Sequence, residues 1–241
     1  AGLDATTDLA LAEVMYRAAW KYKVKYVLEG HSFMEEGITP MGSNYFDGKF
    51  IESIHKLFGK KKMQSYPLMT LSRFLFWIVF ARIQKIRPFW YIDYNKDDAK
   101  KFLEKEYDWK YYGGHHLENR MTAFFHSIYL PQKFNTDMRN NTLSALVRNG
   151  KRDRLEAWKE YNTPPYIEKD LLEYFKKRLE LSDEEYEKIM TRKPKSWTEY
   201  PTYKKTFELL RPLFKILAKA NLVPMSFYLK YCFPMPKDDK K

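Results

Sequence analysis

The 241-residue sequence has little cysteine, glycine or proline: one cysteine, Cys232, nine glycines and twelve prolines. A lone cysteine excludes an internal disulfide framework and a zinc site with several cysteine ligands, and it fits a reducing compartment such as the cytoplasm. Glycine and proline are too sparse for a fibrous or low-complexity chain. With 44% hydrophobic and 17% aromatic residues, the composition predicts a packed protein of one large or two small domains.

The sequence also lacks a long apolar run and a recognisable signal peptide. The best membrane candidate, LMTLSRFLFWIVFARI at 68–83, is shorter than the ~20 residues that a span needs and contains Arg73 and Arg82. This run therefore predicts a buried helix. Because the first residue is Ala1 and not Met, we expect the chain to be part of a longer polypeptide.

Acidic residues are scarce near the carboxyl terminus. The formal net charge is +12, and the segment 201–241 holds nine Lys or Arg residues against three acids. Such a positive segment favours anionic partners, which include nucleic acid, nucleotide-linked substrates and a phospholipid surface. A solvated basic tail is the alternative.

The amino-terminal part of the chain has the pattern of an α/β unit. Apolar spacing predicts a helix over 8–22, the segment KYVL at 25–28 predicts a strand, and Gly30 follows as a turn. The loop from Gly30 to Gly37 would then lie at the carboxyl end of a parallel strand, where α/β proteins bind ligands. Its paired Glu35 and Glu36 suit Mg²⁺, or they compensate the dipole of a first helical turn.

The segment 112–139, YGGHHLENRMTAFFHSIYLPQKFNTDMR, sets ionisable groups in an aromatic frame. The groups suited to proton, phosphate or carboxylate chemistry are His115, His116, Glu118, Arg120, Lys133, Asp137 and Arg139. The aromatic side chains that would form walls are Phe124, Phe125, Tyr129 and Phe134. This combination predicts a polar pocket.

The spacing of apolar residues predicts a helix over 118–129, which would fix the directions of some of these side chains. On a helix His115 and His116 would point about 100° apart, so a shared zinc ion is disfavoured. His115, Glu118 and Thr122 would instead lie along one face. The alignment fits a substrate site or a buried network of capping hydrogen bonds.

The remainder of the sequence is predicted to be mostly helical. We expect Pro131 to end the helix over 118–129, and further helices over 142–161 and 167–179. Ser182 and Glu185 have the spacing of a capping box.

Three pieces of the sequence together resemble the N-acetyl sugar amidotransferase family of surface-polysaccharide biosynthesis. They are KYVLEGHSFMEEG, the run from YGGHHLENR to KRDRLEA at 112–157, and PPY at 164–166. The most specific parts are the block His116, Glu118 and Thr122 and the pattern LPxKFxxDxR at 130–139. The resemblance covers residues 5–190.

The resemblance implies an α/β fold, the carboxyl-terminal part of a PP-loop ATP-pyrophosphatase domain with a parallel sheet, followed by a mostly helical region. The implied parts are the ATP-pyrophosphatase portion at 1–70, a helical substrate region at 71–200 and a basic aromatic extension at 201–241. The family's Ser-Gly-Gly-x-Asp-Ser loop and its cysteine pairs do not occur in this sequence. We therefore expect them upstream of Ala1.

The resemblance also implies a reaction. ATP adenylates the amide oxygen of a nucleotide-linked N-acetyl sugar, and ammonia then displaces AMP, which leaves an acetamidino group. In the family a glutaminase and a cyclase-like subunit supply the ammonia. The implied cofactors are ATP and Mg²⁺.

Site roles follow from the same resemblance and are hypotheses at this stage. The implied catalytic residues are His116, Glu118, Lys133 and Asp137, and the implied substrate-binding residues are Arg120, Thr122 and Arg139. The implied nucleotide-binding residues are Gly30, His31 and Ser32, and the implied metal ligands are Glu35 and Glu36.

Two other functions stay open on the sequence. A PP-loop tRNA-modifying enzyme would use the basic segment, but the aromatic residues do not interleave with the basic ones as a stacking platform, which disfavours nucleic acid. A noncatalytic membrane-surface or assembly module would use 201–241. The expected location is the cytoplasm, with contact at the inner face of the membrane.

Overall fold

The computed structural model describes residues 5–37, 45–114 and 117–235, and these are mostly helical. Within them lies one small parallel sheet of two strands. The helical region is thus as expected, whereas the larger sheet of a PP-loop domain is not among the described residues.

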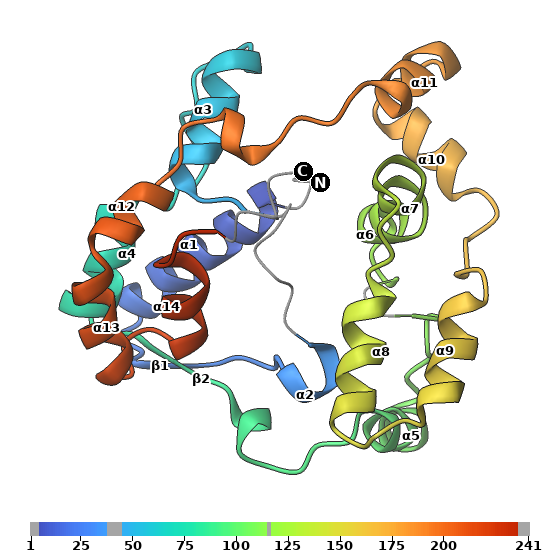
Figure 1. Ribbon diagram of the computed structural model, residues 1–241, viewed down its shortest axis with the longest axis horizontal. Coiled ribbons are helices and arrows are strands. Elements are labelled where there is room, and N and C mark those ends of the chain that lie inside the picture. The colour runs from blue at the N-terminus through green and yellow to red at the C-terminus, as the bar shows by residue number, and fades with distance from the viewer. Residues whose placement is uncertain (1–4, 38–44, 115–116, 236–241) are drawn as a thin grey trace. The chain divides into compact units, whose positions relative to one another are not determined.

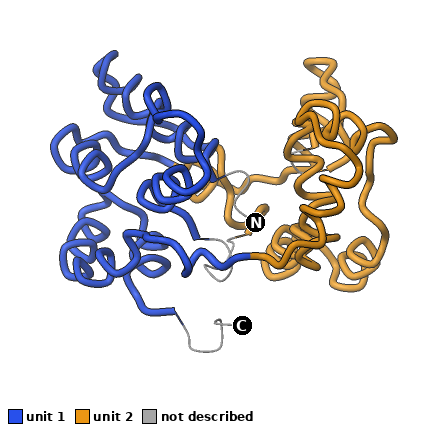
Figure 2. The backbone as a smooth tube through the Cα atoms, turned by 90° about the horizontal axis from the view of Figure 1, so that it is seen from above, with its two compact units in different colours: residues 1–29, 40–86, 195–241 blue, residues 30–39, 87–194 orange. Residues whose placement is uncertain are grey.

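The chain forms two compact units, each assembled from segments far apart in the sequence (Figure 2). Unit 1 contains residues 1–29, 40–86 and 195–241, and unit 2 contains residues 30–39 and 87–194. The domains predicted from the sequence follow one another along the chain, so neither unit coincides with one of them.

Unit 1 combines the sheet with helices from both ends of the chain (Figure 1). Its elements are α1 (Ala5–Lys21), β1 (Tyr26–Leu28), α3 (Gly48–Phe58), α4 (Leu71–Leu75), the π-helix η1 (Phe76–Phe80), β2 (Gln84–Ile86), the 3-10 helix η4 (Trp197–Glu199), α12 (Lys204–Leu209), α13 (Arg211–Lys219) and α14 (Met225–Tyr231).

Unit 2 is helical. Its elements are α2 (Phe33–Glu36), the 3-10 helix η2 (Pro88–Trp90), α5 (Lys96–Tyr107), α6 (Arg120–Phe124), the π-helix η3 (Phe125–Tyr129), α7 (Leu130–Phe134), α8 (Arg139–Arg148), α9 (Arg154–Asn162), α10 (Leu171–Arg178) and α11 (Asp183–Thr191).

The core of unit 1 encloses a charged side chain. Tyr16, Trp77, Phe214 and other apolar residues of α1, η1 and α13 pack together, and Glu13 is fully buried beside them. Trp77 Nε1 donates to Glu13 at 2.9 Å, and the guanidinium groups of Arg17 and Arg73 form ion pairs with the same carboxylate. These partners offset the cost of burying the charge. The local sequence around Glu13 does not predict this role, because Arg73 and Trp77 lie 60 and 64 residues further along the chain.

The sheet of unit 1 is covered on one face. Val27 packs against the core, and the ammonium of Lys85, its register partner, lies 5.4 Å from the centre of the Tyr16 ring. On the opposite face Tyr26 and Leu28 are 60% and 70% exposed. The second strand comes from residues 84–86, outside the predicted 1–70 segment.

The apolar run 68–83 does not form one uniform helix. It contains α4 and η1, after which Arg82 has a positive φ of 52° and the chain enters β2. Gln84 N donates to Lys25 O at 2.8 Å, which begins the pairing with β1. The prediction of a buried helix over 68–83 is therefore confirmed only for the part that forms α4 and η1. A local pattern could not show the strand because its partner lies far away in the sequence.

The core of unit 2 holds α6 against α10. The rings of Phe124 and Phe175 stack at 3.5 Å between centroids, and Leu171 is buried beside them. The prediction that Pro131 ends the preceding helix was wrong, because α7 continues to Phe134. The wide π-turn before it joins Leu130 N to Phe125 O, and such a turn gives the proline ring room that a regular α-helix lacks.

Candidate functional site

Three aromatic side chains follow the end of α5. Asp108 has a positive φ of 52° and ends the helix. The rings of Trp109, Tyr111 and Tyr112 then lie 5.6 to 6.0 Å apart between centroids. Tyr111 is 46% exposed and Tyr112 is 38% exposed. The rings therefore support one another and still present surface to solvent.

A carboxylate adjoins these rings. The Tyr112 hydroxyl donates a hydrogen bond to Glu118, and burial together with this carboxylate raises the pKa of Tyr112. The expectation that Glu118 and Thr122 share one helical face was wrong, because α6 begins at Arg120. Asn119 is its N-cap, and its side chain accepts from Met121 N and Thr122 N.

Arg120, two residues after Glu118 in the sequence, contacts a different ring and a different carboxylate. The Arg120 guanidinium lies 3.8 Å from the centre of the Tyr174 ring, which is a cation–π contact. Its Nε is 3.3 Å from a carboxylate oxygen of Glu168, although this buried Nε has no aligned hydrogen-bond acceptor among the described residues.

The loop that carries Tyr166 lies against the chain at Gly113, which follows Tyr112. A Cβ at Gly113 would be 3.5 Å from the Tyr166 ring, and Gly113 has a φ of 88°, so glycine is favoured on conformational grounds. We call Trp109, Tyr111, Tyr112, Glu118, Arg120 and Tyr166 the aromatic–carboxylate cluster. Ring faces, a carboxylate acceptor and a guanidinium donor are the groups that recognise a polar ring compound.

Lys133 lies on α7 and contacts the end of α11. Its ammonium donates to three carbonyl oxygens at the end of α11, those of Ile189, Met190 and Arg192. Burial and the charge of Arg192 lower the pKa of Lys133. A cation here satisfies the open carbonyls of a helix C-terminus, so Lys133 stabilises the contact between α7 and α11.

Asp137 and Arg139 have a similar arrangement at another helix. Arg139 Nε and Nη2 donate to the two carboxylate oxygens of Asp137, at 2.6 to 3.1 Å. Its Nη1 and Nη2 also donate to backbone oxygens of Glu160, Tyr161 and Thr163 at the end of α9. This guanidinium is already saturated by protein acceptors.

The structure shows no shared site for the other predicted residues that it describes. His116, with His115, lies outside the described residues. Thr122 is in the first turn of α6, where its backbone N–H is capped by Asn119. A Cβ at Gly30 would contact a ring atom of Phe89 at 3.9 Å. Ser32 is buried at the start of α2.

The predicted metal ligands have separate cationic partners. Glu35 is buried, and Lys151 donates to it at 2.8 Å. This hydrogen bond is the main cause of the raised pKa of Lys151. Glu36 lies 3.7 Å from Lys96 and 3.8 Å from His31. In the described part of the chain no three His, Cys, Asp or Glu side chains are placed to hold a metal ion.

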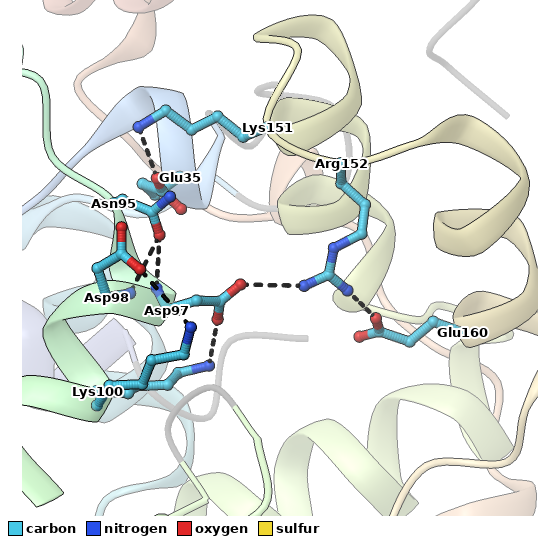
Figure 3. Close-up of polar contacts among 9 residues, drawn as sticks. Glu35, Asn95, Asp97, Asp98, Lys100, Lys151, Arg152 and Glu160 are labelled. Atoms are coloured by element: carbon cyan, nitrogen blue, oxygen red, sulfur yellow. Dashed lines mark hydrogen bonds and ion pairs between the residues drawn. The ribbon is translucent and has the colours of Figure 1, made fainter.

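Arg152, which follows Lys151 in the sequence, belongs to a charge network that joins α5, the turn after α8 and α9 (Figure 3). Asp97 contacts Lys100 at 3.1 Å and Arg152 at 3.4 Å, and Arg152 also pairs with Glu160. Burial alone would raise the pKa of Asp97, but the contacts with the two cations outweigh it and lower that pKa. The alternation of signs is typical of an ion-pair network that holds helices together.

The comparisons with known proteins are consistent with part of the sequence-based expectation. Residues 118–213 match the model of the LPS biosynthesis protein WbpG-like C-terminal domain. Comparisons with curated proteins and with solved structures gave no match. Among the described residues, no helix is long and apolar enough to cross a membrane. Residues 118–213 are therefore similar to the C-terminal domain of WbpG-like proteins, which supports a role for this chain in LPS or polysaccharide biosynthesis.

Proposed function

We propose that the chain is part of an ATP-dependent N-acetyl sugar amidotransferase. It converts the acetamido group of a nucleotide-linked sugar into an acetamidino group for surface-polysaccharide biosynthesis. The aromatic–carboxylate cluster carries this proposal, because Glu118 and Arg120 lie in the segment that matches the LPS-biosynthesis domain model. The finer reaction comes from the sequence resemblance.

The cluster suits a sugar ring. The flat faces of Trp109 and Tyr111 stack on the apolar face of a pyranose, and the Glu118 carboxylate accepts hydrogen bonds from its hydroxyl or amide N–H groups. Arg120 supplies a positive charge for the phosphate of the nucleotide carrier. In this proposal Glu118 holds the acetamido group of the sugar while ATP adenylates the oxygen of that amide.

The proposed ATP portion has a separate line of support. Parallel sheets occur almost only with both faces covered, yet Tyr26 and Leu28 leave one face of the β1–β2 sheet exposed. A larger parallel sheet with a further layer would cover that face. The Ser-Gly-Gly-x-Asp-Ser loop would belong to that larger sheet, and the loop from Gly30 to Ser32 would border the nucleotide.

Mg²⁺ binding by Glu35 and Glu36 does not fit the observed contacts. Lys151 already neutralises the buried Glu35, and Glu36 faces Lys96. A shared cation would have to displace both ammonium groups, so no step of the proposed reaction depends on these two carboxylates. The ammonia-supplying glutaminase and its cyclase-like subunit are partners implied by the resemblance alone.

The test is amidine formation by the full-length protein with ATP, ammonia and a nucleotide-linked N-acetyl sugar, followed by mass spectrometry. Glu118→Gln should lower turnover at least ~100-fold, the lower end of the range for one positioned acid–base group. Trp109→Ala should raise KM for the sugar. Glu104→Gln on the exposed side of α5 is the matched control.

Two results would overturn the proposal. If the wild-type protein forms no amidine with any nucleotide-linked N-acetyl sugar, the reaction is wrong. If it does, but Glu118→Gln and Trp109→Ala turn over as fast as Glu104→Gln, the reaction stands and the site assignment is wrong.

A further inference from the structure

Helices α13 and α14 of unit 1 carry positive charge without acidic residues. From Leu209 to Met235 the sequence contains Arg211, Lys215, Lys219 and Lys230 and no Asp or Glu. Arg211, Lys215 and Lys219 are exposed. Within the described residues neither Lys215 nor Lys219 forms an ion pair. This surface therefore keeps its charge available for an anionic partner.

Apolar side chains are exposed on the same helices. Leu209 at the end of α12 is 79% exposed, and Ile216 on α13 is 65% exposed. On α14 the exposed apolar residues are Met225 and Leu229. The buried face of α13 is formed by Phe214, Leu217 and Ala218, so the helix is apolar toward the core and again on an outer stripe.

Charge and apolar surface lie side by side on α13. Leu213 and Ile216 are three residues apart and share one face of the helix, while Lys215 and Lys219 are four apart and follow the adjacent face. A long lysine side chain can extend past an apolar stripe and keep its ammonium in a polar layer. This is the arrangement of a helix that lies in the plane of a membrane interface.

The chemistry of the surface favours lipid over two other occupants. Its exposed side chains are aliphatic, whereas a surface for single-stranded nucleic acid uses aromatic rings on which bases stack. A second copy of the chain paired through the same surface would bring cations against cations, because an isologous contact repeats the same patch.

We propose that the α12–α13 surface, made by Leu209, Leu213, Ile216, Lys215 and Lys219, binds the anionic headgroups and outer acyl region of a membrane. The apolar stripe enters the interface, and the two lysines contact headgroup phosphates. This inference is independent of the proposed reaction, since none of these residues belongs to the aromatic–carboxylate cluster.

Vesicle flotation of the full-length protein tests it. Vesicles of phosphatidylcholine alone are compared with vesicles that also contain phosphatidylglycerol, at low and high salt. The wild-type protein should float with the anionic vesicles and lose binding as salt rises. The double variant Lys215→Gln/Lys219→Gln should bind roughly 10- to 30-fold more weakly.

The double variant Leu209→Ser/Ile216→Ser should also lose binding, and both positions are exposed enough for the fold to tolerate serine. The control is Leu155→Ser/Lys188→Gln in unit 2, which changes an exposed leucine and an exposed lysine elsewhere. Thermal unfolding confirms that each variant is folded.

The proposal fails if the wild-type protein does not float, or if it floats equally with both kinds of vesicle. It also fails if either double variant of the α12–α13 surface binds as tightly as the unit 2 control. Concentration-dependent dimerisation that only the leucine–isoleucine variant abolishes, without flotation of the wild type, would assign the surface to a second copy instead.

Discussion

The Arg139 guanidinium forms a two-pronged contact with the carboxylate of Asp137, with Nη2 2.6 Å from Oδ2 and Nε 3.1 Å from Oδ1. The carboxylate fixes the plane of the guanidinium, and the remaining donors reach the last carbonyls of α9. Six residues earlier, Lys133 closes α11 in the same manner. The pattern LPxKFxxDxR thus contains two helix-end contacts.

Replacement of Arg139 by lysine should destabilise the protein by about 1–3 kcal/mol, because one ammonium cannot serve Asp137 and three carbonyls together. Urea unfolding followed by circular dichroism measures the loss. Arg148→Lys on exposed α8 surface should leave the free energy of unfolding unchanged. Equal values for the two variants would contradict the assigned role of Arg139.

Replacement of Lys133 by methionine should cost a similar ~1–3 kcal/mol, because the carbonyls of α11 lose a charged donor. The exposed Lys193→Met variant is the control. If Lys133→Met left the unfolding free energy at the control value and abolished amidine formation, Lys133 would have a direct part in catalysis, as the sequence resemblance implies.

Cys232 should resist thiol reagents in the native protein. Its side chain is fully buried, and burial raises the pKa of its thiol to about 11. At pH 8 about one thiol in a thousand is then ionised. Labelling by a disulfide reagent should be slow in buffer and fast in urea, and fast labelling in buffer would show that the α14 end opens readily.

Asp97 predicts a specific acid sensitivity. Because its pKa in the folded state is lowered from 3.8, it contributes stability at neutral pH that is lost as pH falls through the lowered pKa. Asp97→Asn should be less stable than wild type at pH 7, and the difference should vanish in strong acid. Asp98→Asn, at a carboxylate 72% exposed, should show little of this dependence.

Some of the architecture could be predicted from local sequence. The capping box at Ser182 and Glu185 is confirmed, and the strand predicted at 25–28 is observed as β1, Tyr26–Leu28. These features depend on residues within one or two turns of each other, or on an apolar run bounded by a glycine.

Features that depend on distant partners could not be predicted in this way. The carbonyls bound by Lys133 lie 56 to 59 residues further along the chain. From the sequence alone, Lys133 therefore fits a structural role and a role in a substrate site equally well. Glu13 and its partner Trp77 are 64 residues apart. Tyr112, Glu118 and Arg120 are close in sequence, but the contacts with Tyr166 and Tyr174 required the fold.

The interleaving of the two units has a practical result for fragment design. A piece cut at the boundaries of the matched domain, 118–213, would contain α12 but only the first three residues of α13. It would lack Phe214 and Phe227, whose rings pack against Phe207 in the unit 1 core. It would also separate Lys151 from Glu35. Such a piece would expose apolar surface and aggregate. The segment 118–213 that matches the domain model is therefore not a unit that folds by itself.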